Sequence, residues 1–189
     1  DWRFLFVIFA IVDIAMIAYL ALTQIHEPDG KKEVSTFADC FKMLGQGTIL
    51  MLFIGIIMHV GIDVGINITA PKLLQERAGM TLDQAGYATS LYFLVRTFAC
   101  LAGSFILSRY SPAKFFIIST VMILAGIIGM LFLKSVAAIY VCVGLVGAGN
   151  SNVFSMIFSN ALRSVPGKDN EISGLMMVGI SGGALVPVL

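Results

Sequence analysis

Four ionisable residues stand inside stretches of the chain that are otherwise almost wholly apolar: Asp13, His59, Asp63 and Arg96. Ionisable groups are expensive inside a lipid bilayer, where they usually face a charged partner or a water-filled cavity. Their side chains suit ion pairing, proton transfer and hydrogen bonding to a polar solute. These four residues are therefore the first candidates for chemistry.

Three polar residues of one apolar stretch, His59, Asp63 and Asn67, recur at every fourth position. In a helix this spacing places them on nearly one face, one turn above another. Gly61 and Gly65 occupy a neighbouring face, where small residues allow a second helix to approach closely. We expect one side of this helix to be wet and another side to be packed.

Arg96 stands in the next apolar stretch. At about 1.5 Å per helical residue, it lies about 16 Å from the outer end of its stretch, and Asp63 lies about 11 Å from the outer end of its own. An arginine side chain can span this difference in depth. The sequence predicts an ion pair between Asp63 and Arg96, or a polar cavity that both residues line. The alternative is an architectural pair that only locks two helices together.

Glycines and amides interrupt a later apolar stretch, in the run Gly147-Ala148-Gly149-Asn150-Ser151-Asn152 and then at Ser155, Ser159 and Asn160. Such residues weaken a helix and leave polar groups for a ligand, as in the discontinuous helices of membrane proteins that bind solutes. The alternative is close helix packing with amide hydrogen bonds between helices. Gly179, Gly182 and Gly183 are more typical of packing than of binding.

Other polar signals are either ambiguous or set aside. Asp13 either carries a proton or contacts a part of the protein outside this sequence. His59 either titrates or stays neutral and hydrogen-bonded. The glycosylation pattern Asn67-Ile68-Thr69 lies at the end of an apolar stretch, and Gly147-Ala148-Gly149 lacks the strand and the third glycine of a dinucleotide-binding loop. Neither pattern is taken as functional.

Catalytic and metal-binding constellations are not visible in the sequence. The three cysteines, Cys40, Cys100 and Cys142, are scattered without paired spacing, which argues against a zinc site and against a disulfide framework. No nucleophile stands beside a base. We expect a protein that is not an enzyme and that holds no metal and no cofactor.

The elements that must position these residues are membrane helices. Of the 189 residues, 58% are hydrophobic and 12% are charged, whereas soluble domains carry about 25% charged residues. The mean hydropathy is +0.95 and the net charge is +1, so there is no basic surface for a phosphate backbone. This composition excludes a soluble domain, a secreted enzyme and a nucleic-acid-binding protein.

Six stretches approach the length of about 20 mostly apolar residues that a helix needs to cross hydrocarbon. They are Phe4–Thr23, Gly47–Ala70, Ala85–Leu107, Phe115–Leu133, Ala137–Leu162 and the shorter Ser173–Leu189. The stretches are continuously apolar instead of alternating, which favours helices over barrel strands. The predicted fold is an all-α membrane protein with six transmembrane helices.

The connections between these stretches differ in length. The only long polar one runs from His26 to Lys42, and the next, from Pro71, ends in Thr81-Leu82-Asp83-Gln84. That tetrapeptide has the capping-box spacing and is predicted to start the third span. Shorter polar turns are predicted at Arg109–Lys114, Lys134–Val136 and Arg163–Glu171.

Lysine and arginine are distributed unequally between the two faces of the predicted bundle, seven to four in favour of the face with the long connection. Positive loops stay in the cytoplasm during insertion, so we expect this connection to be cytoplasmic. The chain starts at Asp1 without a methionine and reaches Leu189 inside an apolar run. We therefore expect a longer protein of which this chain is one part.

The order of these features resembles helices six to eleven of the major facilitator superfamily, and within it the fucose, galactose and glucose:proton symporters. His59-Val60-Gly61-Ile62-Asp63 resembles the aromatic–x–Gly–x–Gln/Glu segment of their helix seven. The other resembling segments are the helix eight-to-nine turn at Gly103–Lys114, helix ten at Asn152–Asn160 and helix eleven at Gly179–Pro187. Asp63 stands where the symporters have glutamine or glutamate, and Arg96 comes one turn earlier than their helix-eight arginine.

The resemblance implies half of a twelve-helix fold of two six-helix bundles, with a solute site between the bundles near the bilayer midplane. Residues 1–25 would be helix six, the last of the amino-terminal bundle. Residues 26–46 would be the cytoplasmic linker between the bundles, and residues 47–189 the truncated carboxy-terminal bundle with helices seven to eleven. The proton-carrying acids of the resembled family lie mainly in the amino-terminal half.

By this resemblance we expect a secondary active transporter that moves a small polar solute, a sugar, across the inner (cytoplasmic) membrane by alternating access with proton coupling. Its partners would be the solute, protons, the lipid bilayer and the missing amino-terminal half, and no nucleic acid. The expected solute-binding residues are His59, Asp63, Asn67, Arg96, Asn150 and Asn152. One alternative is a major facilitator exporter of organic anions or drugs, and a more distant one is a membrane receptor or scaffold that transports nothing.

Overall fold

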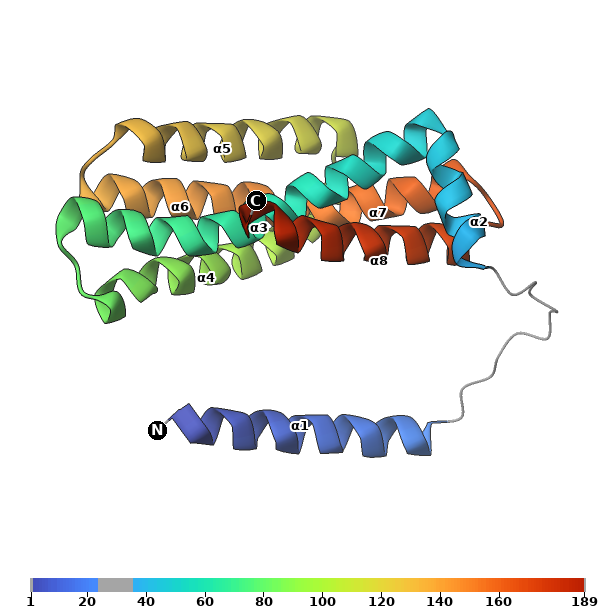
Figure 1. Cartoon of the computed structure of the whole chain (residues 1–189), viewed down its shortest axis with the longest axis horizontal. Coiled ribbons are helices and arrows are strands. Elements are labelled where there is room, and N and C mark those ends of the chain that lie inside the picture. Colours follow the sequence, from blue (N-terminus) through green and yellow to red (C-terminus); the bar gives the residue numbers. More distant parts are fainter. Residues whose placement is uncertain (1, 24–35, 189) are drawn as a thin grey trace. The chain divides into compact units, whose positions relative to one another are not determined.

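The computed structural model describes residues 2–23 and 36–188 of the chain, and within these ranges there are helices and turns but no β-strand (Figure 1). Contacts divide the chain into two units, residues 1–34 and residues 35–189. The first unit contains one helix, α1 (Trp2–Leu22). The second unit contains α2 (Phe37–Lys42), α3 (Gly47–Ala78), α4 (Leu82–Leu107), α5 (Pro112–Phe132), α6 (Val136–Asn150), α7 (Val153–Ser164) and α8 (Asp169–Leu185), with short 3₁₀ turns at Met43–Gly45 and Val186–Val188.

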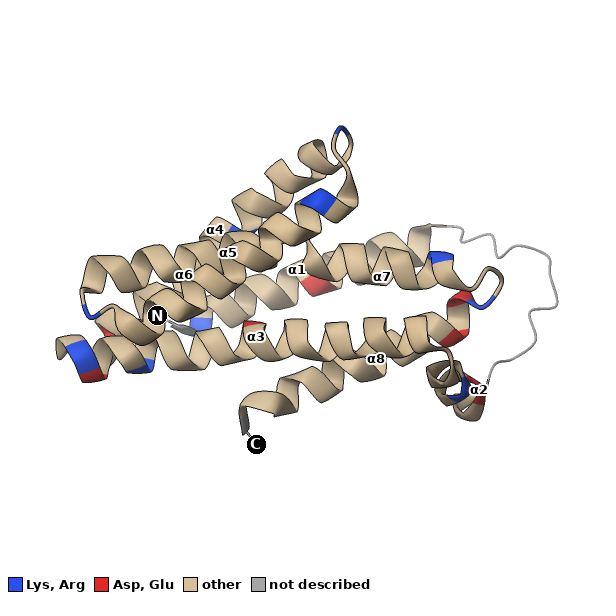
Figure 2. Ribbon diagram, turned by 90° about the horizontal axis from the view of Figure 1, so that it is seen from above, with Lys and Arg blue, Asp and Glu red and all other residues tan. Residues whose placement is uncertain are grey.

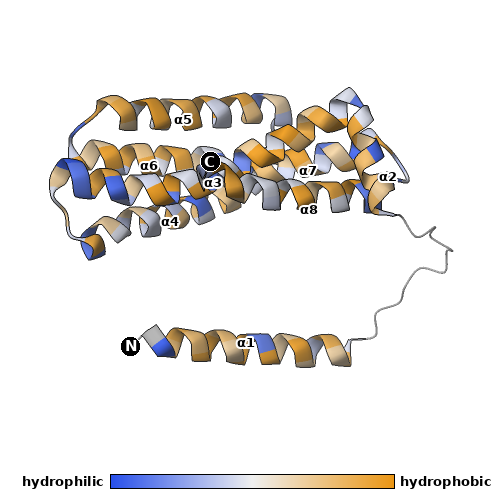
Figure 3. Ribbon diagram, viewed as in Figure 1, coloured by the Kyte–Doolittle hydropathy of each residue, from blue (hydrophilic) through white to orange (hydrophobic). Residues whose placement is uncertain are grey.

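The predicted all-α membrane fold is confirmed. Within the described ranges, five helical segments are long and apolar enough to cross a membrane: Arg3–Leu22, Gly47–Ala78, Leu82–Leu107, Pro112–Phe132 and Val136–Ser164. The sixth predicted span corresponds to α8, whose 17 residues fall below the length of about 20 that spans hydrocarbon. Apolar residues dominate these helices, and most charged residues lie toward helix ends and turns (Figures 2 and 3).

The predicted linker, residues 26–46, is described only from residue 36 onward, and the polar run Pro28–Glu33 lies outside the described residues. The described part forms α2, which begins with a capping box between Thr36 and Asp39. Lys42 also donates to the Asp39 carboxylate at 2.8 Å. The hydrogen bonds from Lys42 and Thr36 hold the pKa of Asp39 well below its usual range.

The connection between α3 and α4 is much shorter than the sequence predicted. A loop was expected from Pro71, but this expectation is wrong: α3 continues through Pro71 to Ala78. The helix ends at Gly79, whose left-handed φ of 62° suits glycine, and the Met80 amide donates back to the Leu74 carbonyl. The predicted capping box of Thr81 and Gln84 then starts the next helix, three residues earlier than expected.

Two contacts explain why α3 stays helical beyond Pro71. A proline inside a helix removes one backbone hydrogen bond, which membrane proteins tolerate where packing holds the outer turns. The segment beyond Pro71 buries Leu74 completely. Arg77, one turn further, donates to the carbonyls of Met130, Leu131 and Leu133 at 2.7–3.3 Å, and so closes the carboxyl end of α5.

The fifth predicted span is interrupted, as its glycines and amides indicate. The helix stops at Asn150 and restarts at Val153, which separates α6 from α7. A Cβ atom on Gly147 would lie 2.8 Å from the Tyr92 carbonyl oxygen, and one on Gly149 would lie 2.6 Å from the Ser119 carbonyl oxygen. These glycines therefore let α6 approach both α4 and α5, and this approach places Asn150 deep in the bundle.

α3 is the central helix of the second unit, because it packs against α4, α6, α7 and α8. Its contact with α8 depends on small residues: a Cβ atom on Gly183 would lie 2.7 Å from the Ile57 carbonyl oxygen, and one on Gly179 would lie 3.1 Å from the ring of Phe53. These contacts support the packing interpretation of the α8 glycines. They also fix the rotation of α3 about its axis, and with it the direction of its polar face.

Candidate functional site

The polar face of α3 carries the first residues of the candidate site. His59 is 4% exposed, and its ring centroid lies 6.1 Å from that of Phe154 in α7. Asp63 follows one turn later, with 23% of its side chain exposed. Asn67, a further turn on, donates its amide to the backbone carbonyl of Asp63 at 2.7 Å and thus bonds within its own helix.

α4 supplies the partners of the Asp63 carboxylate. Arg96 Nη1 lies 2.5 Å from Asp63 Oδ1, so the predicted ion pair is confirmed. The hydroxyl of Tyr92 donates to the same oxygen at 2.6 Å. Tyr92 and Arg96 are four residues apart and so share a face of α4. Two side chains of α4 thereby hold one carboxylate oxygen of a residue in α3.

Asn150, the last residue of α6, completes the network. Its amide nitrogen donates to the Tyr92 hydroxyl at 3.0 Å, and its side chain is fully buried. A chain of hydrogen bonds therefore runs from Asn150 through Tyr92 to Asp63, where it meets Arg96. His59 lies in electrostatic range of Asp63 and Arg96. We call His59, Asp63, Tyr92, Arg96 and Asn150 the polar cluster.

The three spans that contribute to the cluster, namely α3, α4 and the span formed by α6 and α7, each place its residues near their middle. Asp63 is 16 residues after the start of α3 and 15 before its end, and Asn150 is 14 residues from either end of Val136–Ser164. Measured from the connection between α3 and α4 at about 1.5 Å per residue, Asp63 is about 22 Å along its helix and Arg96 about 21 Å. The predicted difference in depth is wrong because it assumed that the helix ended before Pro71.

The polar cluster keeps unused hydrogen-bonding capacity. Within the described ranges, the buried atoms Nδ1 of His59, Oδ1 of Asn150 and Oδ1 of Asn67 have no partner at full hydrogen-bond geometry, although the side chains of His59 and Asn150 lie close enough to interact with each other. Buried polar atoms are nearly always satisfied by protein, water or a ligand. Asp63 and Arg96 are each about a quarter exposed, so one side of the ion pair is accessible.

Charge in the cluster is balanced. The carboxylate of Asp63 and the guanidinium of Arg96 cancel, and Tyr92, Asn150 and His59, counted as uncharged, contribute dipoles and no net charge. In a medium of low dielectric constant, such pairing avoids the high cost of an isolated ion. The cluster therefore offers hydrogen-bond donors and acceptors to a solute, with no net charge.

Asn152, which the sequence groups with Asn150, lies apart from the polar cluster. Its amide nitrogen donates to the Ala99 carbonyl at 3.2 Å and to the Ser151 hydroxyl at 3.0 Å, and Cys100 Sγ lies 3.8 Å from its oxygen. These contacts tie the break between α6 and α7 to α4. A direct role of Asn152 in solute binding stays a prediction.

Tyr92 is the member of the cluster that sequence reasoning missed. One signal was available, because Tyr92 lies one turn before Arg96 within an apolar stretch. A tyrosine that is 0% exposed needs a partner for its hydroxyl. The sequence alone does not indicate which acceptor that partner is.

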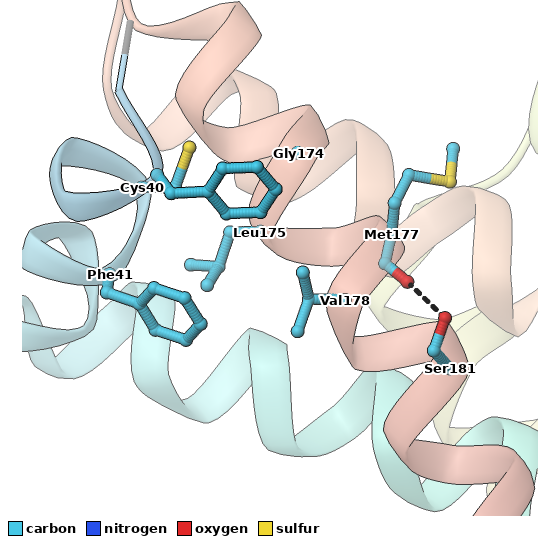
Figure 4. A pocket seen from close by; sticks show the side chains of 8 residues that line it. Cys40, Phe41, Gly174, Leu175, Met177, Val178 and Ser181 are labelled. Atoms are coloured by element: carbon cyan, nitrogen blue, oxygen red, sulfur yellow. Dashed lines mark hydrogen bonds between the residues drawn. The ribbon is translucent and has the colours of Figure 1, made fainter.

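Two grooves lie elsewhere in the second unit. One, of about 430 Å³, separates α2 from α8 and is lined by Phe37, Cys40, Phe41, Gly174, Leu175, Met177, Val178 and Ser181 (Figure 4). None of the predicted site residues lines it. The other, of about 790 Å³, includes the α7 residues Ser155, Ser159, Asn160 and Arg163 together with parts of α3, α4 and α5.

α7 is amphipathic although it belongs to a membrane span. Val153, Ile157 and Ala161 are buried, whereas Ser155, Ser159, Asn160 and Arg163 are exposed and line the larger groove. The helix begins three residues after Asn150 of the polar cluster. A polar face thus continues from the middle of the span toward its end.

Comparison with protein families gives this arrangement a context. A family model described as Major Facilitator Superfamily matches residues 1–187. The chain belongs to the Major Facilitator Superfamily. No curated protein and no solved structure is matched. This superfamily consists of transporters, so the chain is a multi-pass membrane protein of a transporter family.

Within the Major Facilitator Superfamily assignment, the polar cluster is the strongest candidate for a solute site. It is drawn from three spans at one depth, and it combines an accessible ion pair with unsatisfied buried atoms. Solute sites of such transporters lie near the bilayer midplane, where discontinuous helices expose polar groups. The α6–α7 break beside Asn150 is such a discontinuity.

Proposed function

We propose that this major facilitator protein is a secondary active transporter of a small, neutral, hydroxyl-rich solute of the sugar class. It moves the solute across the inner membrane by alternating access, with proton coupling. The polar cluster binds the solute near the bilayer midplane, opposite the amino-terminal bundle. The resemblance to sugar:proton symporters and the chemistry of the cluster both support this proposal.

The neutrality of the cluster is the observation that carries the proposal. Arg96 is paired with Asp63 at 2.5 Å, so an anionic solute would meet a carboxylate beside the guanidinium. A neutral polyol meets no such repulsion. Its hydroxyl groups can donate to the Asp63 carboxylate and accept from the Arg96 guanidinium, whose side chains are each about a quarter exposed.

Accessibility separates this proposal from a purely architectural ion pair. A pair that only locks two helices is best sealed from solvent, yet 24% of the Arg96 side chain and 23% of the Asp63 side chain are exposed. Exposed ion pairs in a membrane span face a hydrated cavity in preference to lipid. This exposure supports a hydrated path beside α3 and α4.

The test is thermal unfolding of the intact protein in detergent with L-fucose, D-galactose, D-glucose and a set of organic acids. A bound solute stabilises the folded state by mass action, by about 2.7 kcal/mol at one hundred times its dissociation constant. We expect at least one sugar to raise the unfolding temperature and the acids to have no effect. Uptake of the same labelled sugar into vesicles then measures transport.

The matched variants are the pair substitution Asp63→Leu with Arg96→Leu and the control Asp83→Leu. The pair substitution removes the polar groups without leaving an unpaired charge. Asp83 lies exposed in the first turn of α4, away from the cluster. Sugar stabilisation should vanish in the first variant and persist in the control. Stabilisation by acids alone would favour an anion exporter, and the absence of both stabilisation and uptake would favour a receptor or scaffold.

A further inference from the structure

The larger groove of the second unit, of about 790 Å³, has two walls of opposite character. One wall belongs to α7 and carries the polar side chains of Ser155, Ser159, Asn160 and Arg163. The facing wall, from α3, α4 and α5, is apolar and includes Phe116 and Ile117. A ligand that satisfies both walls must itself be amphipathic.

A cation without a counter-ion stands at one end of the groove. Arg163 is exposed in the last turn of α7, and none of the ion pairs among the described residues includes it. No acidic residue of the described ranges lines the groove. Arg109 and Lys114 flank the turn that leads into α5, so basic residues gather at this end of the unit (Figure 2). The groove therefore attracts a negative charge at this end.

The polar groups one turn inside Arg163 are also free to bind a ligand. Other exposed hydroxyls turn back to a carbonyl of their own helix, as those of Thr97 and Thr120 do at 2.8 Å and 2.9 Å. Within the part of the chain that the structure describes, the hydroxyl of Ser159 and the side-chain amide of Asn160 make no hydrogen bond. Both side chains are exposed and line the groove.

The groove runs from the end of a membrane span toward its middle. Ser155 and Arg163 are eight residues apart on α7, which corresponds to about 12 Å along the helix. One leaflet of a hydrocarbon core of about 30 Å is about 15 Å thick. The groove therefore has nearly the depth of one leaflet, with its charged end at the level of the lipid headgroups.

We propose that this groove binds one anionic phospholipid. The phosphate lies against Arg163, the glycerol and ester oxygens meet Ser159 and Asn160 at the hydrated interface, and one acyl chain follows the apolar wall past Ile117. Binding is non-covalent. The site goes beyond the transport function proposed above, because no residue of the polar cluster lines the groove.

The chemistry of the two walls selects this class of ligand. A guanidinium binds a phosphate through two parallel hydrogen bonds, and basic pockets between transmembrane helices bind anionic headgroups. A free anion would leave the apolar wall uncovered, and an uncharged lipid would leave Arg163 without a counter-ion. An anionic phospholipid satisfies both walls at once.

The test is native mass spectrometry of the intact protein in detergent with phosphatidylglycerol or phosphatidylcholine of identical acyl chains. We expect one phosphatidylglycerol molecule to be retained with about fivefold preference, because one basic residue near a lipid surface contributes that much to binding an anionic lipid. Glycerol phosphate, which has the charged group without the chains, should not displace it. Equal retention of the two lipids overturns the proposal, and this is also the result if another segment of the intact protein fills the groove.

Two matched pairs of variants locate the lipid. Arg163→Gln should abolish the preference for phosphatidylglycerol, whereas Lys134→Gln, in the exposed turn at the other end of α5, should keep it. Ile117→Trp should block the acyl chain, whereas Ile118→Trp should not. Ile117 and Ile118 are 61% and 59% exposed, but only Ile117 lines the groove.

Each pair gives a decision of its own. Since all four side chains are exposed, their replacement removes no buried contact, and an unchanged unfolding temperature checks folding. If Arg163→Gln does not fold, the isoleucine pair still decides. Unchanged preference in Arg163→Gln, equal retention by the two tryptophan variants, or displacement of the lipid by glycerol phosphate overturns the proposal. No sugar is needed, so the result does not depend on whether the proposed transport function is correct.

Discussion

Tyr92 is the residue through which the three helices of the cluster are connected. Its hydroxyl donates to Asp63 and accepts from Asn150, so one oxygen atom links α3, α4 and α6. The Asp63–Arg96 pair could be predicted from the sequence because charges in apolar stretches are few. Tyr92 could not be assigned, since a tyrosine near a polar helix has many possible acceptors, and only the packing of α6 against α4 brings Asn150 to it.

We expect Tyr92→Phe to destabilise the protein by about 1–3 kcal/mol, because it leaves the buried amide of Asn150 without its acceptor and removes one donor from Asp63. The measurement is thermal unfolding in detergent. Tyr87→Phe is the control, since Tyr87 is 67% exposed in the same helix. Equal stability of the two variants would mean that the Tyr92 hydroxyl contributes nothing to the network.

Helix α6 packs closely against α4 and α5 because glycine stands at two sites where the backbones of those helices pass. We expect Gly147→Ala to destabilise the protein by about 1–3 kcal/mol, because the added methyl group would meet the Tyr92 carbonyl oxygen at 2.8 Å. Gly144→Ala is the matched control in the same helix, where the nearest atom would be Val95 Cγ2 at an ordinary 3.8 Å. Because alanine favours helix over glycine, the control should be neutral or slightly stabilising.

The same variants test how α6 positions the cluster. If Gly147→Ala pushes α6 away from α4, the hydrogen bond from Asn150 to Tyr92 lengthens, and sugar stabilisation should fall more than in Gly144→Ala. Unfolding temperatures of both variants with and without sugar measure this. Indistinguishable stability of Gly144→Ala and Gly147→Ala would contradict the close approach of the two helices.

The carboxyl end of α3, beyond Pro71, depends on Arg77. Its guanidinium donates to three carbonyls at the end of α5, and hydrogen bonds from charged donors are stronger than neutral ones. We expect Arg77→Gln to speed amide exchange in the last turn of α5 and in α3 beyond Pro71. Arg109→Gln, which removes the same charge from an exposed turn, should leave amide exchange in these turns of α3 and α5 unchanged. Unaltered exchange in Arg77→Gln would show that packing alone holds these turns.

Sequence reasoning was most reliable for element type and least reliable where distant contacts decide. Hydropathy identified five of the six predicted spans among the described residues, and the Thr81–Gln84 capping box marked the start of α4, which begins three residues before the predicted apolar stretch. Pro71 was taken as the start of a loop, because a proline usually ends a helix. The helix continues because Leu74 is buried and Arg77 reaches a helix more than fifty residues away in the chain, contacts that no local pattern contains.

At a larger scale, the second unit carries polar residues both at the middle of its spans and along α7. The polar cluster lies midway along three spans, and the polar face of α7 starts at the α6–α7 break and continues to Arg163 along the larger groove. An apolar helix face of equal exposure, such as that of α5, is expected to face lipid. If the polar face of α7 is hydrated, water-soluble reagents should react there and not on the apolar face of α5.

We expect Ser159→Cys, in a protein whose native cysteines are all replaced, to react with a membrane-impermeant maleimide, because Ser159 lines the groove. Val121→Cys is the control: Val121 is 58% exposed on apolar α5, where lipid excludes both water and thiolate formation. Labelling is followed by mass spectrometry. A bound sugar should slow the reaction at position 159 if the groove belongs to the transport route. No labelling at position 159 would mean that the polar face of α7 borders no water, and equal labelling at both positions would mean that this face is no more hydrated than the apolar face of α5.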